Sequence, residues 1–379
     1  MRIAALIKKI LTSLFRLLPT KNIILFESVP DLSDNTKPVF DELLRMGYNN
    51  KYKMVWSCCS HPRNDYPKIQ NVVYIDATKH KIINLYYICR SKLVIVCNRF
   101  LCVDRKGQIS FYLMHGTTIK DVSSYYTCPS YLNYVITSGE GVNELCSRVF
   151  RFPLNKCIPL GYPRNDEMIN ANLNLSLYFG HFKKYIIWYP TVRQFKGGGK
   201  TGSKEPIPIL FYKDNAIKLN KSASKLGVLI IIKPHFAQAT EYIKKMALSN
   251  IRFINDDFFL NNNISSYSLV GSCDALLTDY SSVYYDYLLK NRPIGLIWED
   301  LEEYKKNPGV IKEFDFFMKG GIKIYNCNDL VKFIETVSKG EDSLMSQRRE
   351  ICSLANVSTS PDNAARVTNF IIEKSGLRM

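Results

Sequence analysis

The sequence has few of the residue patterns that build metal centres and disulfide frameworks. Its 379 residues include five histidines and eleven cysteines, but no two cysteines form a C-x-x-C pair and no histidine follows cysteines at zinc-finger spacing. It has no D-x-D triplet and no carboxylate cluster that would hold magnesium at the end of a strand. We therefore expect a site without metal or cofactor, and the odd number of scattered cysteines indicates a reducing cytoplasm.

Acidic residues are scarce relative to basic ones. Asp and Glu total 34 and Lys and Arg total 51, which gives a net charge of +17. This balance suits an anionic partner, which is nucleic acid, an acidic membrane surface or a phosphate-rich substrate. Because the aromatic residues lie mostly within apolar runs and no RNA- or DNA-binding motif occurs, nucleic acid is the least favoured of the three.

The first twenty residues, MRIAALIKKILTSLFRLLPT, form an apolar stretch that charges interrupt repeatedly. The interruptions argue against a transmembrane helix, and no small-residue cleavage site marks a signal peptide. Helical spacing places the apolar residues on one face, namely Ile3, Leu6, Ile7, Ile10, Leu11, Leu14, Phe15 and Leu18. We expect residues 1–21 to form an amphipathic helix on an anionic membrane surface. Packing of the helix against its own domain is the alternative.

Apolar, strand-like segments alternate with helix-like segments along most of the chain. One series runs from NIILFES (22–28) to NYVITSG (133–139), and a second runs from KYIIWYP (184–190) to PIGLIW (293–298). A chain of this length exceeds one ordinary core, and the alternation predicts parallel sheets. We predict an α/β protein with two doubly wound domains, 22–170 and 171–355, followed by a C-terminal helix over 356–379.

Four polar segments each follow an apolar run, where parallel sheets bind ligands: MHGTTIK (114–120), YPTVR (189–193), IKPH (232–235) and TDYSS (278–282). His115 can act as a general base, and Gly116 lets a backbone approach closely. Arg193 and Lys233 supply fixed positive charge. A lone histidine is more often structural and surface cations are usually solvated, so the argument rests on their shared placement.

The segment LLTDYSSVYYDYLLKNRPIG (276–295) predicts a strand, a tight turn and a helix. Thr278 and Asp279 mark the end of the strand. Ser281 or Ser282 can accept hydrogen bonds from the first free amides of the helix. Such a junction at the carboxyl end of a parallel strand favours a phosphate, and a serine that only caps its helix is the alternative.

Two further polar residues are candidate substrate ligands. GYPRND (161–166) follows the apolar run KCIPL, and its turn can bring the guanidinium of Arg164 to a cleft between the two halves; a simple interdomain turn fits equally well. Asp286 lies one helical turn beyond Ser282 and can accept from a ribose or glycerol hydroxyl. Without a metal, cationic side chains and hydroxyls would have to neutralise a bound phosphate.

In this order, FES (26–28), SDNTK (33–37), MHGTTIK, GYPRND, YPTVR, KPH and LLTDYSSVYYDYLLKNRPI resemble the CDP-glycerol glycerophosphotransferase family of teichoic acid synthesis, over residues 22 to about 340. The resemblance implies a GT-B type fold with two Rossmann-like domains that face one cleft. It also implies CDP-glycerol held mainly by the C-terminal domain and a lipid-linked glycan or teichoic acid precursor as acceptor, at the cytoplasmic face of a bacterial membrane. An acceptor hydroxyl would attack the β-phosphorus and release CMP.

The resemblance also assigns roles to single residues. His115 matches the histidine of the HGT motif, which is proposed to be the base, and His235 matches a second essential histidine near the pyrophosphate. Arg193, Ser281 and Ser282 match phosphate-contacting positions. The chain departs from the family at two positions, because Thr118 stands where proline is usual and Val192 where tryptophan or phenylalanine is usual. The local loop shape can therefore differ.

Other activities remain open at the sequence level. Polymerases of the family generally carry extra N-terminal domains, and only a short helix precedes the first strand here, which favours a single-transfer or priming enzyme. CDP-ribitol or another CDP-polyol is an alternative donor, because no residue in the sequence identifies the number of hydroxyl groups on the polyol. The runner-up activity is that of a GT-B glycosyltransferase that uses a nucleotide sugar.

Overall fold

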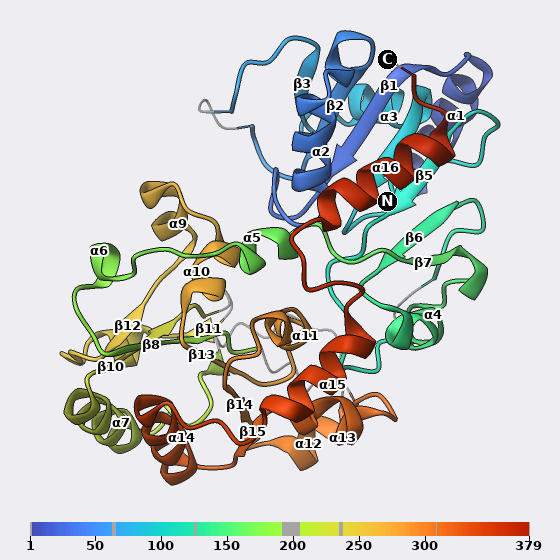
Figure 1. The fold of residues 1–379 in the computed structure, drawn as a ribbon. Helices are drawn as coiled ribbons and strands as arrows, with labels where there is room; N and C mark the ends of the chain where they lie inside the picture. The colour runs from blue at the N-terminus through green and yellow to red at the C-terminus, as the bar shows by residue number, and fades with distance from the viewer. Residues whose placement is uncertain are drawn as a thin grey trace. The chain divides into compact units, whose positions relative to one another are not determined.

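The structure is a computed structural model that describes residues 2–62, 66–124, 127–191, 205–234, 238–307 and 309–378. The chain divides into two compact units (Figure 1). Unit 1 comprises Met1–Thr117, Tyr126–Asp166 and Ser360–Met379, and unit 2 comprises Thr118–Tyr125 and Glu167–Thr359. Each unit contains one large sheet of parallel strands, so the protein belongs to the mixed α/β class.

Unit 1 is built on a seven-stranded sheet in the order β3-β2-β1-β4-β5-β6-β7. Its inner strands are apolar runs buried along most of their length, as parallel strands usually are, whereas the edge strands β3 and β7 are partly exposed. The chain adds β2 and β3 on one side of β1 and then returns to place β4 on the other side, so β1 and β4 flank the switch point of the sheet. The strands are β1 (Lys21–Glu27), β2 (Lys53–Cys58), β3 (Val72–Asp76), β4 (Ser91–Val96), β5 (Ile109–Tyr112), β6 (Tyr134–Thr137) and β7 (Cys157–Pro159).

Helices cover this sheet and complete the core of unit 1. Phe26 of β1, Phe40 and Trp56 of β2 form a buried aromatic cluster with ring centroids 5.1 to 5.5 Å apart. Val367 and Ile371 from the far end of the chain join the same core. The helices are α1 (Arg2–Leu17), α2 (Thr36–Arg45), η1 (Tyr48–Asn50), α3 (Lys81–Arg90), η2 (Glu140–Val142), α4 (Asn143–Phe150), η3 (Leu154–Lys156) and α16 (Asn363–Ser375), and α5 (Asn165–Ile169) crosses into unit 2.

Unit 2 has a six-stranded sheet in the order β12-β10-β8-β13-β14-β15, and the small pair β11-β9. The switch point lies between β8 and β13, because the chain adds β10 and β12 on one side of β8 before β13 pairs on the other. The strands are β8 (Lys184–Trp188), β9 (Glu205–Pro206), β10 (Val228–Ile232), β11 (Gln238–Ala239), β12 (Ile251–Phe253), β13 (Ala275–Thr278), β14 (Ile294–Ile297) and β15 (Ile322–Ile324).

The core of unit 2 forms where α7 and α14 pack their apolar faces on the sheet. Leu219 and Leu330 are fully buried there with Ile230 of β10. The helices of this unit are α6 (Ser176–Phe179), α7 (Lys213–Leu226), α8 (Glu241–Lys244), α9 (Asp256–Asn262), α10 (Ser266–Ser272), α11 (Val283–Tyr287), η4 (Leu288–Lys290), α12 (Leu301–Lys306), α13 (Phe314–Phe317), η5 (Met318–Gly320), α14 (Cys327–Lys339) and α15 (Met345–Ala355).

The two units are discontinuous in sequence, which the alternation of strands and helices does not reveal. We expected one boundary between residues 170 and 171, whereas the units divide after Asp166. The carboxylate of Asp166 accepts hydrogen bonds from the main-chain nitrogens of Asn363 and Ala364, at 3.0 and 2.8 Å, and so ties α16 to unit 1. The segment after Thr117, by contrast, belongs to unit 2. There the carbonyl oxygen of Ile119 accepts a hydrogen bond from the main-chain nitrogen of Ile311 at 3.0 Å.

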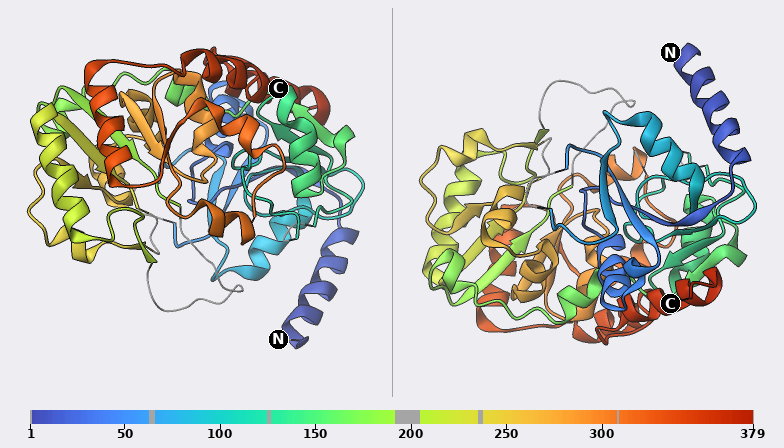
Figure 2. Two further views of the ribbon diagram at one scale, coloured as in Figure 1. Left: turned by 90° about the horizontal axis from the view of Figure 1, so that it is seen from below. Right: turned by 90° about the horizontal axis from the view of Figure 1, so that it is seen from above.

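Helix α1 projects from the rest of unit 1, with α3 as its packing neighbour (Figure 2). Phe15 packs edge-on against Tyr86 of α3, with ring centroids 5.6 Å apart. Leu11 is half-buried like Phe15. The other apolar side chains of α1 that the structure describes are exposed, including Ile10 and Leu14 at 51% and 53%. Within the described part of the chain, no helix is both long enough and apolar enough to cross a membrane.

Candidate functional site

His115 lies on a sharp turn at the carboxyl end of β5. The backbone φ angle is +50° at Met114 and +141° at Gly116. Methionine rarely adopts a positive φ, and the second value is open essentially to glycine alone. The backbone therefore turns sharply on either side of His115, in a strained conformation that neighbouring contacts must stabilise.

The imidazole of His115 contacts unit 1 through one ring nitrogen. Its Nδ1 lies 3.3 Å from the carbonyl oxygen of Cys97, which follows β4, and 3.5 Å from the hydroxyl of Tyr112. A carbonyl can only accept, so the proton of the neutral ring belongs on Nδ1. Nε2 then carries the lone pair that a general base needs.

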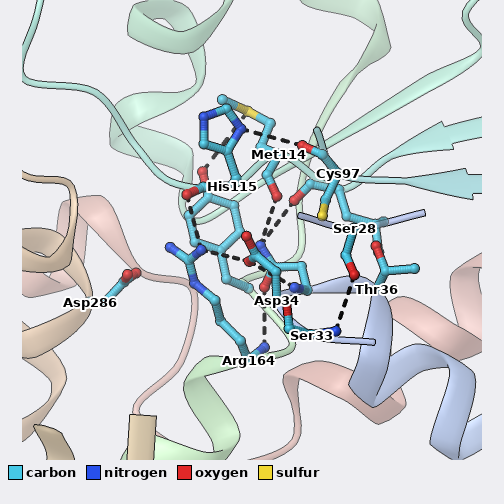
Figure 3. A network of polar contacts seen from close by, with 12 residues as sticks. Ser28, Ser33, Asp34, Thr36, Cys97, Met114, His115, Arg164 and Asp286 are labelled. Carbon is cyan, nitrogen blue, oxygen red and sulfur yellow. Dashed lines mark hydrogen bonds and ion pairs between the residues drawn. The ribbon is translucent and has the colours of Figure 1, made fainter. Parts of the chain in front are cut away.

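Hydrogen bonds from Asn35 and Arg164, both in unit 1, hold the turn (Figure 3). Nη1 of Arg164 donates to the carbonyl oxygen of His115 at 3.0 Å and pairs with Oδ1 of Asp34 at 2.6 Å. The side-chain amide of Asn35 donates to the carbonyl oxygens of Leu113 and Met114, at 3.2 and 2.9 Å. The side chain of Arg164 is only 8% exposed, so the guanidinium that the sequence suggested as a substrate ligand lies inside the unit.

Thr117, directly after Gly116, is fixed to two other loops of unit 1. The hydroxyl of Thr117 lies 2.8 Å from the Ser138 hydroxyl, at the end of β6, and 3.2 Å from the hydroxyl of Tyr162. All three side chains are buried. The HGT motif is thus the meeting point of the loops that follow β5, β6 and β7.

The switch point of unit 1, between β1 and β4, carries an ion pair whose carboxylate is buried and whose arginine side chain is 38% exposed. Glu27 is fully buried, and its Oε1 lies 2.9 Å from Nε of Arg99. Its Oε2 accepts from the main-chain nitrogens of Asn98 and Arg99, both at 3.1 Å. The carboxylate therefore fixes the loop that leaves β4 beside Cys97, the residue that contacts His115.

At the switch point of unit 2, the side chain of Asp279 joins the ends of two neighbouring strands. Its carboxylate accepts from the main-chain nitrogen of Thr191, at 2.9 and 3.1 Å, from the Thr191 hydroxyl at 2.5 Å and from the main-chain nitrogen of Tyr280 at 2.6 Å. The hydroxyl of Thr278 donates to the carbonyl oxygen of Tyr189 at 3.1 Å. Both side chains thus join the loop after β8 to the end of β13. These contacts position the two strand ends where a doubly wound sheet binds its ligand.

The two serines of the TDYSS segment lie at the start of α11. Ser281 accepts weakly from the main-chain nitrogen of Val283, at 3.5 Å. Ser282 occupies the N-cap position, but its side chain makes no capping hydrogen bond. Both are half-buried. Their hydroxyls are therefore not committed to a strong cap.

Two more candidates of unit 2 have partners of their own. Asp286 is 1% exposed, and its Oδ2 accepts from the hydroxyl of Tyr267 at 2.6 Å. Lys233, directly after β10, pairs with the exposed carboxylate of Asp256 at 3.0 Å. The Lys233 side chain is 21% exposed and that of Asp256 is 74% exposed, so the lysine is the more buried partner of the pair.

Three sequence candidates or departures, Val192, Arg193 and His235, lie outside the described residues. Their roles stay predictions. Among the residues that the structure describes, no group of three His, Cys, Asp or Glu side chains is placed to hold a metal ion.

Sequence reasoning found the strand ends but not the residues that connect them. Asn35 stands in the SDNTK stretch, which was singled out without a role, and Asp34 stands beside it. Ser138 and Tyr162 carried no signal of their own. Each becomes visible only when the loops after β1, β5, β6 and β7 are brought together.

The chain matches one protein family over most of its length. The model of the CDP-glycerol:poly(glycerophosphate) glycerophosphotransferase family matches residues 10–373. The chain belongs to this family. The likeness inferred from HGT, GYPRND and TDYSS is therefore confirmed, and the match includes both units.

Relatives within the glycerophosphotransferase family include teichoic acid enzymes. The chain is 28% identical to a teichoic acid poly(ribitol-phosphate) polymerase of Bacillus spizizenii over 346 aligned residues. The alignment covers 82% of this chain and 52% of the relative. It is 25% identical over 345 residues to a teichoic acid poly(glycerol phosphate) polymerase of the same organism, which covers 81% and 82%. The chain spans about half the length of several curated relatives, 47% and 52% for two ribitol-phosphate enzymes.

The fold is also that of a solved member of this group. The structure of the wall teichoic acid polymerase TagF superposes with a TM-score of 0.75 at 18% identity, covering 99% of this chain and 95% of that one. At this identity the likeness establishes the fold alone.

Proposed function

We propose that the protein transfers glycerol phosphate from CDP-glycerol to a hydroxyl group of a lipid-linked glycan or teichoic acid precursor, with release of CMP. Family membership supports the phosphotransferase class, and the relatives named above act on glycerol phosphate or ribitol phosphate. The observation that carries the proposal is the contact between His115 Nδ1 and the Cys97 carbonyl, because it supplies an oriented base.

The acceptor hydroxyl is activated by His115. Nε2 of the neutral ring takes the hydroxyl proton as the oxygen attacks the β-phosphorus of CDP-glycerol. A new phosphorus–oxygen bond forms, the bond from that phosphorus to the bridging oxygen breaks, and the electron pair leaves with CMP. General-base catalysis of this kind typically contributes about 100-fold to 10,000-fold in rate.

The donor diphosphate is bound at the switch point of unit 2. The strand ends tied by Asp279 carry Ser281 and Ser282, and Arg193 follows Thr191 by two residues in the sequence. Lys233 stands at the end of the neighbouring strand β10. Preorganised donors and cations at fixed strand ends are what phosphoryl transfer needs, because charge develops on the phosphoryl oxygens. His235 is proposed to lie near the pyrophosphate, as the resemblance implies.

The acceptor is presented at a membrane surface through α1. Exposed apolar side chains at positions 6, 7, 10, 14 and 17 lie within an arc of about 100°, and the exposed Lys9 and Arg16 lie beside that arc. An apolar stripe with cationic flanks suits an anionic bilayer interface. We therefore include in the proposal a peripheral location at the cytoplasmic face of a bacterial membrane.

Ribitol phosphate is the second candidate group for transfer. A ribitol-phosphate polymerase is among the relatives at similar identity to a glycerol-phosphate polymerase, so the polyol is decided by experiment. Purified protein is incubated with vesicles containing the lipid-linked acceptor and with CDP-glycerol, CDP-ribitol or a nucleotide sugar in turn. CMP release with CDP-glycerol supports the proposal. Turnover of a nucleotide sugar without CMP release from either CDP-polyol refutes it.

A further inference from the structure

Asp34 and Asn35 are two neighbouring polar residues, buried or nearly buried, to which the proposed mechanism assigns no role. They lie between β1 and α2, and Asn35 is fully buried while the side chain of Asp34 is 13% exposed. A buried amide and carboxylate are costly unless their hydrogen bonds are made. Their partners therefore show what the pair is for.

Asn35 uses its side chain to join two loops. Its Nδ2 donates to the carbonyl oxygens of Leu113 and Met114, and its Oδ1 accepts from the main-chain nitrogen of Arg164 at 3.1 Å. All three partners are main-chain groups. The side chain therefore fixes the position and direction of the backbone directly before His115.

Asp34 and Arg164 act on the other side of the same turn. Asp34 pairs with Nη1 of Arg164, and the same nitrogen donates to the carbonyl oxygen of His115. The carbonyls of three successive residues, Leu113, Met114 and His115, are thus each held by a side-chain donor. This is the segment in which Met114 has a positive φ, so the donors hold a strained conformation in place.

We propose that Asn35, Asp34 and Arg164 are positioning residues that orient the imidazole of His115 for catalysis, and that Arg164 acts through His115 instead of binding substrate. This inference rests on the proposed role of His115 as the base. The carbonyl contacts keep the turn in register, so that Nδ1 meets Cys97 and Nε2 faces away from it. A displacement of about 1 Å in such a base costs up to roughly 100-fold in rate.

The chain offers a matched control at the opposite end of β5. Nε2 of Gln108 donates to the carbonyl oxygens of Ile88 and Ser91, at 2.8 and 3.0 Å, and its Oε1 accepts from the main-chain nitrogen of Val103 at 2.9 Å. Gln108 is 8% exposed. It therefore makes the same number and kind of hydrogen bonds as Asn35, in the same unit, but at the amino end of the strand. Asn35→Ala and Gln108→Ala remove equivalent bonds, and only the first lies next to His115.

The first measurement is steady-state kinetics with CDP-glycerol. We expect Asn35→Ala to lower kcat by about 30-fold to 100-fold and to leave the KM for CDP-glycerol within threefold. Gln108→Ala should keep kcat within twofold. The isosteric Asp34→Asn, which keeps the shape of the site, should lower kcat in the same direction if Asn35→Ala folds poorly. A rise in KM in place of a fall in kcat for the Asp34 and Asn35 variants overturns the proposal, as does an Asn35 variant that behaves like the Gln108 variant.

The second measurement does not depend on activity. Protein labelled with ¹⁵N-histidine reports the tautomer of each neutral imidazole by NMR, and the His115 signals are identified by their loss in His115→Gln. Wild type and Gln108→Ala should show the proton on Nδ1 of His115, and Asn35→Ala and Asp34→Asn should shift the population toward the other tautomer. An unchanged tautomer in both network variants overturns the positioning role. If the wild type releases no CMP from any CDP-polyol, the proposed function fails, and the tautomer still decides the role of Asn35 and Asp34.

Discussion

Nδ1 of His115 lies 3.3 Å from the carbonyl oxygen of Cys97, a residue eighteen positions earlier in the chain. The two residues follow β5 and β4, which are neighbours in the sheet of unit 1. The contact directs the ring proton to Nδ1, so the opposite nitrogen is the basic one. Both the proposed activity and the proposed positioning role depend on this relationship.

The first prediction concerns the proposed base. His115→Gln should lower kcat by about 100-fold or more, because a glutamine amide cannot take a proton from the acceptor hydroxyl. Binding of CDP-glycerol, measured by isothermal titration calorimetry, should stay within threefold of wild type, because the donor is proposed to bind in unit 2. A large loss of donor affinity with kcat retained would make His115 a donor ligand.

The second prediction concerns Asp279 at the switch point of unit 2. Asp279→Ala leaves the main-chain nitrogens of Thr191 and Tyr280 without their acceptor. Loss of hydrogen bonds to a buried charged group costs about 3 kcal/mol, which urea unfolding measures. The affinity for CDP-glycerol should also fall, because the two strand ends separate.

Asp274 provides the control for this change, since it joins the same two strands at their other end. It pairs with Lys184 at 2.9 Å and accepts from the main-chain nitrogen of Tyr185 at 2.9 Å. Asp274→Ala should destabilise the protein but leave the affinity for CDP-glycerol unchanged. Equal losses of affinity in the two variants would show that Asp279 acts through stability alone.

Much of the fold could be predicted from the sequence, because parallel strands that are buried on both faces consist of short runs of apolar residues. Each strand expected from such a run is present, including those that lead to His115 and Thr278. The strands β7, β9, β11 and β15 were not expected, and each is only two or three residues long. The exchange of segments between the units was also missed, since the bond from Asp166 to α16 joins residues 198 positions apart.

The candidate site was predictable only in part. A histidine followed by glycine at a strand end carries its own signal, whereas Asn35 and Asp34 look like ordinary turn residues before a helix. The burial of Arg164 was not visible either, because the sequence contains no information on which carboxylate it meets. Such partners are set by loops that are distant in sequence and adjacent in the sheet.

The third prediction concerns α1. Replacing Ile10 and Leu14 together by glutamate should weaken binding to vesicles that contain phosphatidylglycerol by at least about tenfold, because burial of one such side chain contributes ~1.5 kcal/mol or more. Deletion of residues 1–20 should have a similar effect. Co-sedimentation with the vesicles measures both. The double change Leu177→Glu and Leu260→Glu alters two exposed apolar residues of unit 2 and is the control for charge. Equal sedimentation of all variants would refute a membrane role for α1.

The fourth prediction concerns the pH dependence of stability. A hydrogen bond from the Thr78 hydroxyl, with further bonds from the main-chain nitrogens of Thr78 and Lys79, lowers the pKa of Asp76 to about 2. The unfolded value is about 3.9, so this carboxylate stabilises the fold above that pH, and its contribution is lost as pH falls from about 4 to about 2. The stability difference between wild type and Asp76→Asn, from urea unfolding, should therefore shrink over this interval. A constant difference would contradict the prediction.

The most direct test of the account is CMP release from CDP-glycerol by wild type, His115→Gln and Asn35→Ala in the presence of a lipid-linked acceptor. We predict steady CMP release by wild type, a loss of about 100-fold or more in kcat for the His115 variant, and a smaller loss for the Asn35 variant at unchanged donor KM. CMP release by the His115 variant at the wild-type rate would contradict the central claim that this imidazole activates the acceptor.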